Sequence, residues 1–159
     1  MRGGSKLVLM MCAALAFTPA PARAQDKALE AMIAGAMESG DAAALIRRLA
    51  RGGHVKQKPD ARVDYTDYRK VAKPLDFEGQ TIVVIEEEYM KKFVGCCVNE
   101  GFGFVVRVIS GAEGLKARAK AAKCAVGDES GDRDILDRLR IRRKEARYMS
   151  VSCRANDRG

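Results

Sequence analysis

The chain contains no tryptophan and few other aromatic residues, which make up 6% of its 159 residues. Proteins that bind single-stranded nucleic acid alternate basic side chains with aromatic ones, on which the bases stack. Carbohydrate-binding platforms also depend on aromatic faces. The composition therefore argues against both kinds of site, and we expect no nucleic-acid partner.

Histidine is equally scarce, because His54 is the only one. Zinc sites need cysteine and histidine at tetrahedral spacing, and an activated nucleophile usually needs an imidazole base. Glycine-rich phosphate loops and the H-E-x-x-H and G-x-S-x-G motifs are also missing. We therefore predict no catalytic residues, no cofactor and no metal. Whether the protein is an enzyme stays open, with a non-catalytic role favoured.

Long apolar runs are missing except for one near the N-terminus, from Leu7 to Phe17. It follows a short basic segment and precedes the small-residue pattern Ala22-Arg23-Ala24. This order is typical of a signal peptide, and the run is too short to cross a bilayer stably. We predict that residues 1–24 are cleaved, with no membrane span afterwards; an uncleaved anchor is the alternative.

Cleavage after Ala24 would place the protein in the periplasm or outside the cell. Removing 24 of 159 residues leaves 135, the size of one domain. The signal peptide carries three basic residues and no acidic ones, so the formal net charge falls from +8 to +5.

Residues 25–53 show the clearest helical pattern. Leu29, Ile33 and Met37 recur at a helical spacing and define one apolar stripe. Gly40 interrupts the pattern, and a second apolar stripe follows up to Gly52-Gly53, which suits a helix end. The pattern predicts either a helical pair or one kinked helix.

Residues 54–79 are rich in charged residues and contain Pro59 and Pro74. They predict an irregular surface segment with at most a brief strand. The core of the domain is expected at residues 80–154, followed by a polar tail at 155–159. Within the core, residues 81–85 and 102–109 predict strands because they are rich in β-branched and aromatic residues.

Residues 86–99 favour a short helical turn that leads into an irregular loop, with extension of the preceding strand as the alternative. A helix is predicted up to Lys123, with a short strand directly after it. Near the C-terminus, apolar residues alternate with polar ones over 138–142 and 148–153, which predicts a β-hairpin. A single helix over 135–147 is the competing interpretation. The fold class predicted is α+β, with helices packed on a small, mostly antiparallel, disulfide-stapled sheet.

The chain without its signal peptide has four cysteines, which are Cys96, Cys97, Cys124 and Cys153. An even number in an oxidising compartment favours structural disulfides. A bridge between the adjacent Cys96 and Cys97 would be strained, so we expect each of them to pair with Cys124 or Cys153. The sequence favours Cys96–Cys124 with Cys97–Cys153 only weakly.

Arginines are concentrated near the C-terminus, where Arg138, Arg140 and Arg142 would share one face of the predicted hairpin, beside Arg143. Guanidinium groups suit carboxylates and phosphates. The sequence therefore favours a small exported binding or accessory protein, whose partner is another protein or an anionic component of the cell envelope. The alternatives are an exported thiol-redox protein or enzyme that uses Cys96 or Cys97, and a carrier of a small ligand.

Overall fold

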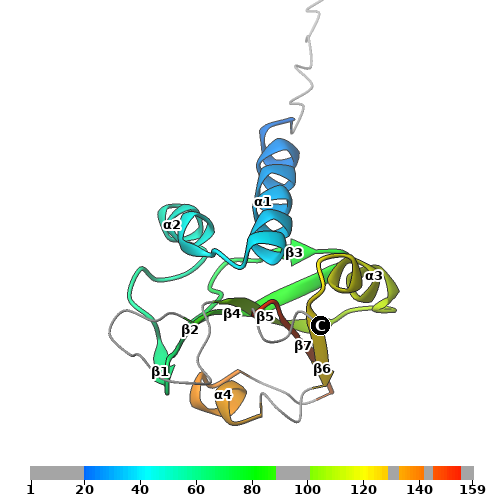
Figure 1. Ribbon diagram of the computed structural model, residues 1–159. Helices are drawn as coiled ribbons and strands as arrows, with labels where there is room; N and C mark the ends of the chain where they lie inside the picture. Colours follow the sequence, from blue (N-terminus) through cyan, green and yellow to red (C-terminus); the bar gives the residue numbers. More distant parts are fainter. Residues whose placement is uncertain (1–19, 89–100, 129–132, 142–144, 155–159) are drawn as a thin grey trace, which may run out of the picture.

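The computed structural model describes residues 20–88, 101–128, 133–141 and 145–154, and only the backbone of residues 20–26. It confirms the α+β class: two N-terminal helices, a seven-stranded antiparallel sheet and further helices (Figure 1). Among these residues, none of the helices combines the length and the apolar composition that a membrane crossing requires.

The N-terminal segment forms two helices, α1 (Ala20–Ser39) and α2 (Ala43–Arg51). The helices separate at Gly40, whose φ of 78° lies in the left-handed region that glycine adopts without strain. The Asp41 side chain then accepts a hydrogen bond from the Ala43 backbone N–H at 2.8 Å, which satisfies one free donor at the start of α2. A helical pair is therefore what the sequence encodes. The predicted cleavage point after Ala24 falls inside α1.

The sheet has the order β1-β2-β4-β5-β7-β6, with β3 paired to β4, and every pairing is antiparallel. Its strands are β1 (Ala61–Val63), β2 (Thr66–Lys70), β3 (Asp76–Phe77), β4 (Gln80–Glu88), β5 (Gly101–Val108), β6 (Ala125–Asp128) and β7 (Arg147–Ser152).

The prediction of irregular chain over residues 54–79 differs from the structure, which places three strands there. The strand β2 contributes buried polar residues to the sheet, so hydrophobic periodicity could not reveal it. The predicted helical turn is also wrong for residues 86–88, which continue β4 and pair with β2 and β5. Residues 89–99 lie outside the described residues.

Two helices follow β5, which are α3 (Glu113–Ala121) and α4 (Arg133–Arg138). The predicted C-terminal hairpin is wrong, because residues 138–141 close α4 and β7 pairs instead with β5 and β6. Ile135, Leu136 and Leu139 are all buried, and this helical spacing packs them on the sheet. The competing long helix over 135–147 is wrong as well, since α4 ends at Arg138.

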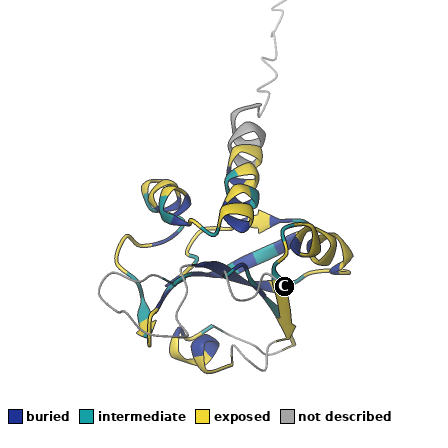
Figure 2. Cartoon of the chain, in the orientation of Figure 1, coloured by how far each residue is buried: buried dark blue, intermediate teal, exposed yellow. Residues whose placement is uncertain are grey.

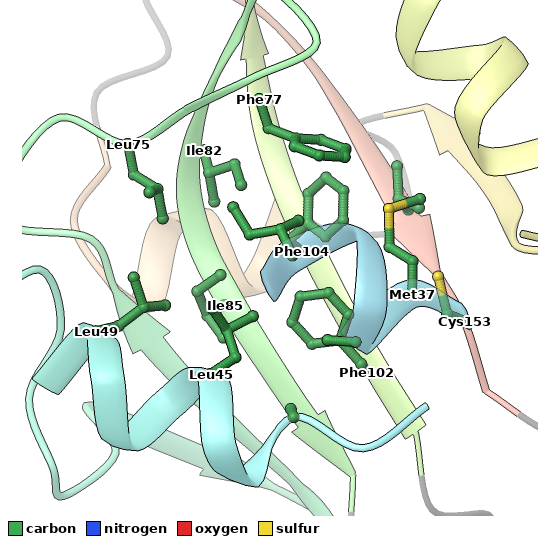
Figure 3. Close-up of a cluster of buried hydrophobic side chains, with 14 of the residues drawn as sticks. Met37, Leu45, Leu49, Leu75, Phe77, Ile82, Ile85, Phe102, Phe104 and Cys153 are labelled. Atoms are coloured by element: carbon green, nitrogen blue, oxygen red, sulfur yellow. The ribbon is translucent and has the colours of Figure 1, made fainter. Parts of the chain in front are cut away.

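The two faces of the sheet carry different hydrophobic clusters. On one face, α1, α2 and α3 pack over β4 and β5 around Ile82, Ile85, Phe102 and Phe104 (Figure 3). On the other face, α4 covers a smaller cluster that includes Val105 (Figures 1 and 2). The central strands are therefore buried on both sides, which explains their continuous apolar runs.

Candidate functional site

The cysteines form a different pairing from the one predicted. Cys124 is bonded to Cys153, with Cα atoms 4.3 Å apart. Cys124 directly precedes β6 and Cys153 directly follows β7, and Ala125 pairs with Ser152 in the sheet. The two cysteines therefore occupy the next opposing position of this ladder. Both proposed pairings with Cys96 and Cys97 are wrong.

Cys96 and Cys97 lie outside the described residues. Their segment connects the end of β4 at Glu88 to the start of β5 at Gly101. Because Cys124 and Cys153 bond to each other, neither is available to the adjacent pair. The scaffold role that the sequence favoured is thus supported for two of the four cysteines.

Arg138 and Arg140 are both exposed, at the C-terminal end of α4, and the structure does not place them on a strand face. Arg142 and Arg143 lie outside the described residues. Arg140 has a φ of 54°, in the left-handed region. The backbone N–H groups of Arg140 and Ile141 donate to the carbonyls of Asp137 and Leu136, at 3.0 and 2.9 Å. This is the Schellman motif that ends many helices, usually with glycine at the left-handed position.

The same motif ends two other helices. In α2 the left-handed residue is Gly53, with a φ of 71°, and His54 donates to the carbonyl of Leu49 at 2.9 Å. In α3 it is Lys123, with a φ of 55°, and Cys124 donates to Ala119 at 2.8 Å. A non-glycine residue costs roughly 1 kcal/mol in this conformation. Arg140 and Lys123 therefore occupy positions where glycine would favour folding more.

A buried ionic cluster lies between α2 and the sheet. Arg69 on β2 has a side chain that is only 6% exposed, and its Nη1 lies 3.0 Å from Glu87 Oε2 on β4. Its Nη2 lies 3.8 Å from Asp67 Oδ2, an ion-pair distance that is too long for a hydrogen bond. The Nε and Nη1 atoms are shielded from solvent and have no hydrogen-bond partner among the described residues, since the Nη1–Glu87 contact is an ion pair without hydrogen-bond geometry. Buried polar groups without a partner are uncommon, so this arginine needs an explanation.

Asp67 is also engaged from the neighbouring strand. Arg62 Nε on β1 donates to Asp67 Oδ1 at 2.6 Å, and this hydrogen bond raises the pKa of the Arg62 guanidinium. The exposed Arg62 thus places a second guanidinium, besides that of Arg69, next to the Asp67 carboxylate.

This cluster forms part of the wall of a pocket of about 320 Å³. Its lining residues are Ala43, Ile46, Arg47, Gln57, Asp67, Arg69 and Glu87. A second pocket of about 240 Å³ shares Ala43 and Glu87 with the first and extends past the α1–α2 junction to Gly101. No sequence motif indicates a function for any of these residues. They come from α2, the segment after it and two strands, and only the pairing of β2 with β4 brings Asp67 opposite Glu87.

A second ionic group lies near the same end of the sheet. Arg154, which follows β7, contacts Glu86 at 3.4 Å and Glu88 at 2.5 Å. Gly101 leaves room for this contact, because a Cβ there would lie 2.7 Å from the backbone Cα of Arg154. A Cβ on Gly103 would lie 2.9 Å from Glu86 Oε2 and 3.1 Å from the Val151 carbonyl oxygen. These ion pairs hold the chain that follows β7 against β4.

Across the described ranges, no three residues of the types His, Cys, Asp and Glu gather where they could hold a metal ion. His54 lies just past the end of α2, partly exposed, and it lines a different pocket, beside Lys27 and Glu30 of α1.

Comparisons of the chain with protein-family models, with curated proteins and with solved structures gave no match.

Proposed function

We propose that this protein is a non-catalytic binding protein, exported to the periplasm or outside the cell, that contacts an anionic envelope component through Arg138 and Arg140. The observation that carries the proposal is the position of Arg140. An exposed arginine occupies a left-handed helix end that glycine would favour, and Arg138 lies next to it. Strain at an exposed residue of this kind is often retained for function.

The local charge supports the same interpretation. The described residues of α4 and its end carry three arginines and two aspartates, and Lys70 reaches the Leu139 carbonyl at 3.3 Å. Basic residues at a helix C-terminus also interact favourably with the helix dipole, so these charges cost the fold little. The Cys124–Cys153 disulfide is consistent with an oxidising compartment.

The experiment measures binding to vesicles of phosphatidylglycerol and phosphatidylethanolamine, and to soluble polygalacturonate, at low and high salt. Loss of one basic residue near an anionic surface costs about 1 kcal/mol, or roughly fivefold in affinity. We expect Arg140→Gly to weaken binding to that extent, and Arg138→Gln with Arg140→Gly to weaken it further. Arg140→Gly should unfold at the same or a higher denaturant concentration than the parent protein.

Lys123→Gly is the matched control, because it removes one positive charge from the same position of the same helix-end motif in α3. It should leave binding unchanged. If it weakens binding as much as Arg140→Gly, only the net charge matters and the surface is wrongly assigned. Unchanged binding by the double variant would also refute the proposal.

A thiol-redox protein is the second candidate, and one observation favours it. A structural role for Cys96 and Cys97 required disulfides to Cys124 and Cys153. Those two cysteines are bonded to each other instead. An insulin-reduction assay distinguishes the two functions. The binding proposal predicts no turnover by the parent protein, whereas turnover that disappears in Cys97→Ser would establish the redox function instead.

A further inference from the structure

The helices α2 and α4 lie on opposite sides of the sheet (Figure 1). The pocket lined by α2, β2 and β4 is therefore separate from the surface proposed above. We propose that this pocket binds a carboxylate group through Arg69 and Arg47. The ligand would be a small organic acid or the C-terminal carboxylate of a peptide.

The hydrogen bonding of the Arg69 guanidinium is incomplete. A buried guanidinium is stabilised only when its donors are satisfied. Among the described residues, Nε and Nη1 have no hydrogen-bond partner, because the 3.0 Å contact of Nη1 with Glu87 is an ion pair without hydrogen-bond geometry. Nη2 is not one of these shielded atoms, and it lies 3.8 Å from the Asp67 carboxylate, so it is the donor that a ligand in the pocket would meet. An acceptor oxygen placed in the pocket at Nη2 would supply the hydrogen bond that Asp67 does not.

The charge balance around the pocket also favours an anionic ligand. The two acidic groups of the pocket are already engaged: Asp67 accepts from Arg62 at 2.6 Å, and Glu87 pairs with Arg69 at 3.0 Å. Arg47 lines the same pocket from α2 and, among the described residues, forms no ion pair. The pocket and its rim thus carry one uncompensated positive charge, which favours a monoanion over a cation.

The shape of the pocket also suits a carboxylic acid. Ala43 and the buried Ile46 form an apolar wall opposite the charged strands, which suits the hydrocarbon part of a carboxylic acid better than the fully polar surface of phosphate. A volume of about 320 Å³ fits a small ligand. The adjoining pocket of about 240 Å³ offers room for a preceding residue of a peptide.

The test is an NMR titration of the isotope-labelled full-length protein, with acetate, Ala-Ala, Ala-Ala-amide and inorganic phosphate as probes. We expect saturable shifts of backbone amides in α2, β2 and β4 with Ala-Ala or acetate. Ala-Ala-amide, which keeps the ammonium but lacks the carboxylate, should bind at least about tenfold more weakly, since a hydrogen bond to a charged group is worth about 1.5–3 kcal/mol. If acetate and Ala-Ala bind with equal affinity, the ligand is a small organic acid. If Ala-Ala binds markedly more tightly, the ligand is the C-terminus of a peptide.

Arg47→Gln and Arg48→Gln provide the matched pair, because both residues are exposed on α2 and only Arg47 lines the pocket. Arg47→Gln should weaken Ala-Ala or acetate binding about tenfold, and Arg48→Gln should leave it unchanged. Arg138→Gln with Arg140→Gly should also bind both probes normally, so this site and the α4 surface fail independently. Three results would overturn the proposal. They are binding of Ala-Ala-amide or phosphate as tight as that of Ala-Ala or acetate, equal losses of affinity in Arg47→Gln and Arg48→Gln, and the absence of saturation in the millimolar range.

Discussion

Glycines in this chain differ sharply in what surrounds them. Gly35 lies near the C-terminal end of α1 on its exposed side, and a Cβ there would meet nothing within 4 Å. A Cβ on Gly101, at the start of β5, would instead lie 2.7 Å from a backbone atom of Arg154. The first position therefore reflects no packing constraint, whereas the second permits β5 to approach the chain that follows β7.

Gly35→Ala is accordingly expected to stabilise the protein by about 0.5–1 kcal/mol, the usual gain for alanine over glycine inside a helix. Gly101→Ala is expected to destabilise it by roughly 1–3 kcal/mol, because the backbone must shift to admit the methyl group. Urea unfolding followed by circular dichroism measures both. Equal effects of the two substitutions would show that the close approach at Gly101 is not a constraint on folding.

At the scale of elements, the sequence predicts those whose apolar pattern is long and regular. The strands at 81–85 and 102–109 and the break between the first two helices belong to this group. The strand prediction for residues 138–142 was wrong because the apolar pattern is ambiguous there. Leu139 and Ile141 fit the alternation of a strand, while Ile135, Leu136 and Leu139 fit a helix equally well. Tertiary burial of these three decided the outcome in favour of α4.

The disulfide joins β6 to β7 at the edge of the sheet. All four residues of β6 are exposed, and β7 is its only strand partner among the described elements. Sequence reasoning missed this pairing because it dismissed the connectivity that joins Cys96 to Cys97. Once β6 and β7 are neighbours, the ladder itself brings Cys124 to Cys153.

Replacing Cys124 and Cys153 by alanine should cost roughly 3–4 kcal/mol of folding free energy, because the bridge spans 29 residues of sequence in the unfolded chain. Urea unfolding measures the loss, and peptide mapping of the unreduced parent protein should recover the Cys124–Cys153 pair. The control is Cys96→Ser with Cys97→Ser, which should leave that bridge intact. Recovery of a peptide linking Cys124 to either of the adjacent cysteines would contradict the assignment.

At the scale of the whole molecule, the carboxylate pocket illustrates what a sequence pattern cannot show. Its charged residues lie on α2, β2 and β4, and the two strands become neighbours through an antiparallel pairing. Asp67, Arg69 and Glu87 individually resemble ordinary surface charges. The burial of Asp67 and Arg69 follows from the position of α2 over the sheet, which no local periodicity encodes.

The position of α1 makes the predicted cleavage testable on the whole fold. The helix begins at Ala20, yet the buried side chains described for it begin at Leu29 and continue through Ile33, Ala36 and Met37. A cut after Ala24 would shorten the helix without touching this stripe. Loss of the helix would remove three large apolar side chains at roughly 1.5–3 kcal/mol each, which is comparable to the entire stability of a typical domain.

A chain that begins at Gln25 is therefore expected to unfold in one cooperative transition and to keep a native near-ultraviolet circular dichroism signal. A chain that begins at Asp41 should show neither, because the face of β4 and β5 under α1 would be exposed (Figure 3). Mass spectrometry of the exported protein should give Gln25 as its first residue. If the chain from Gln25 fails to fold cooperatively, the residues before it belong to the domain, and cleavage after Ala24 is excluded.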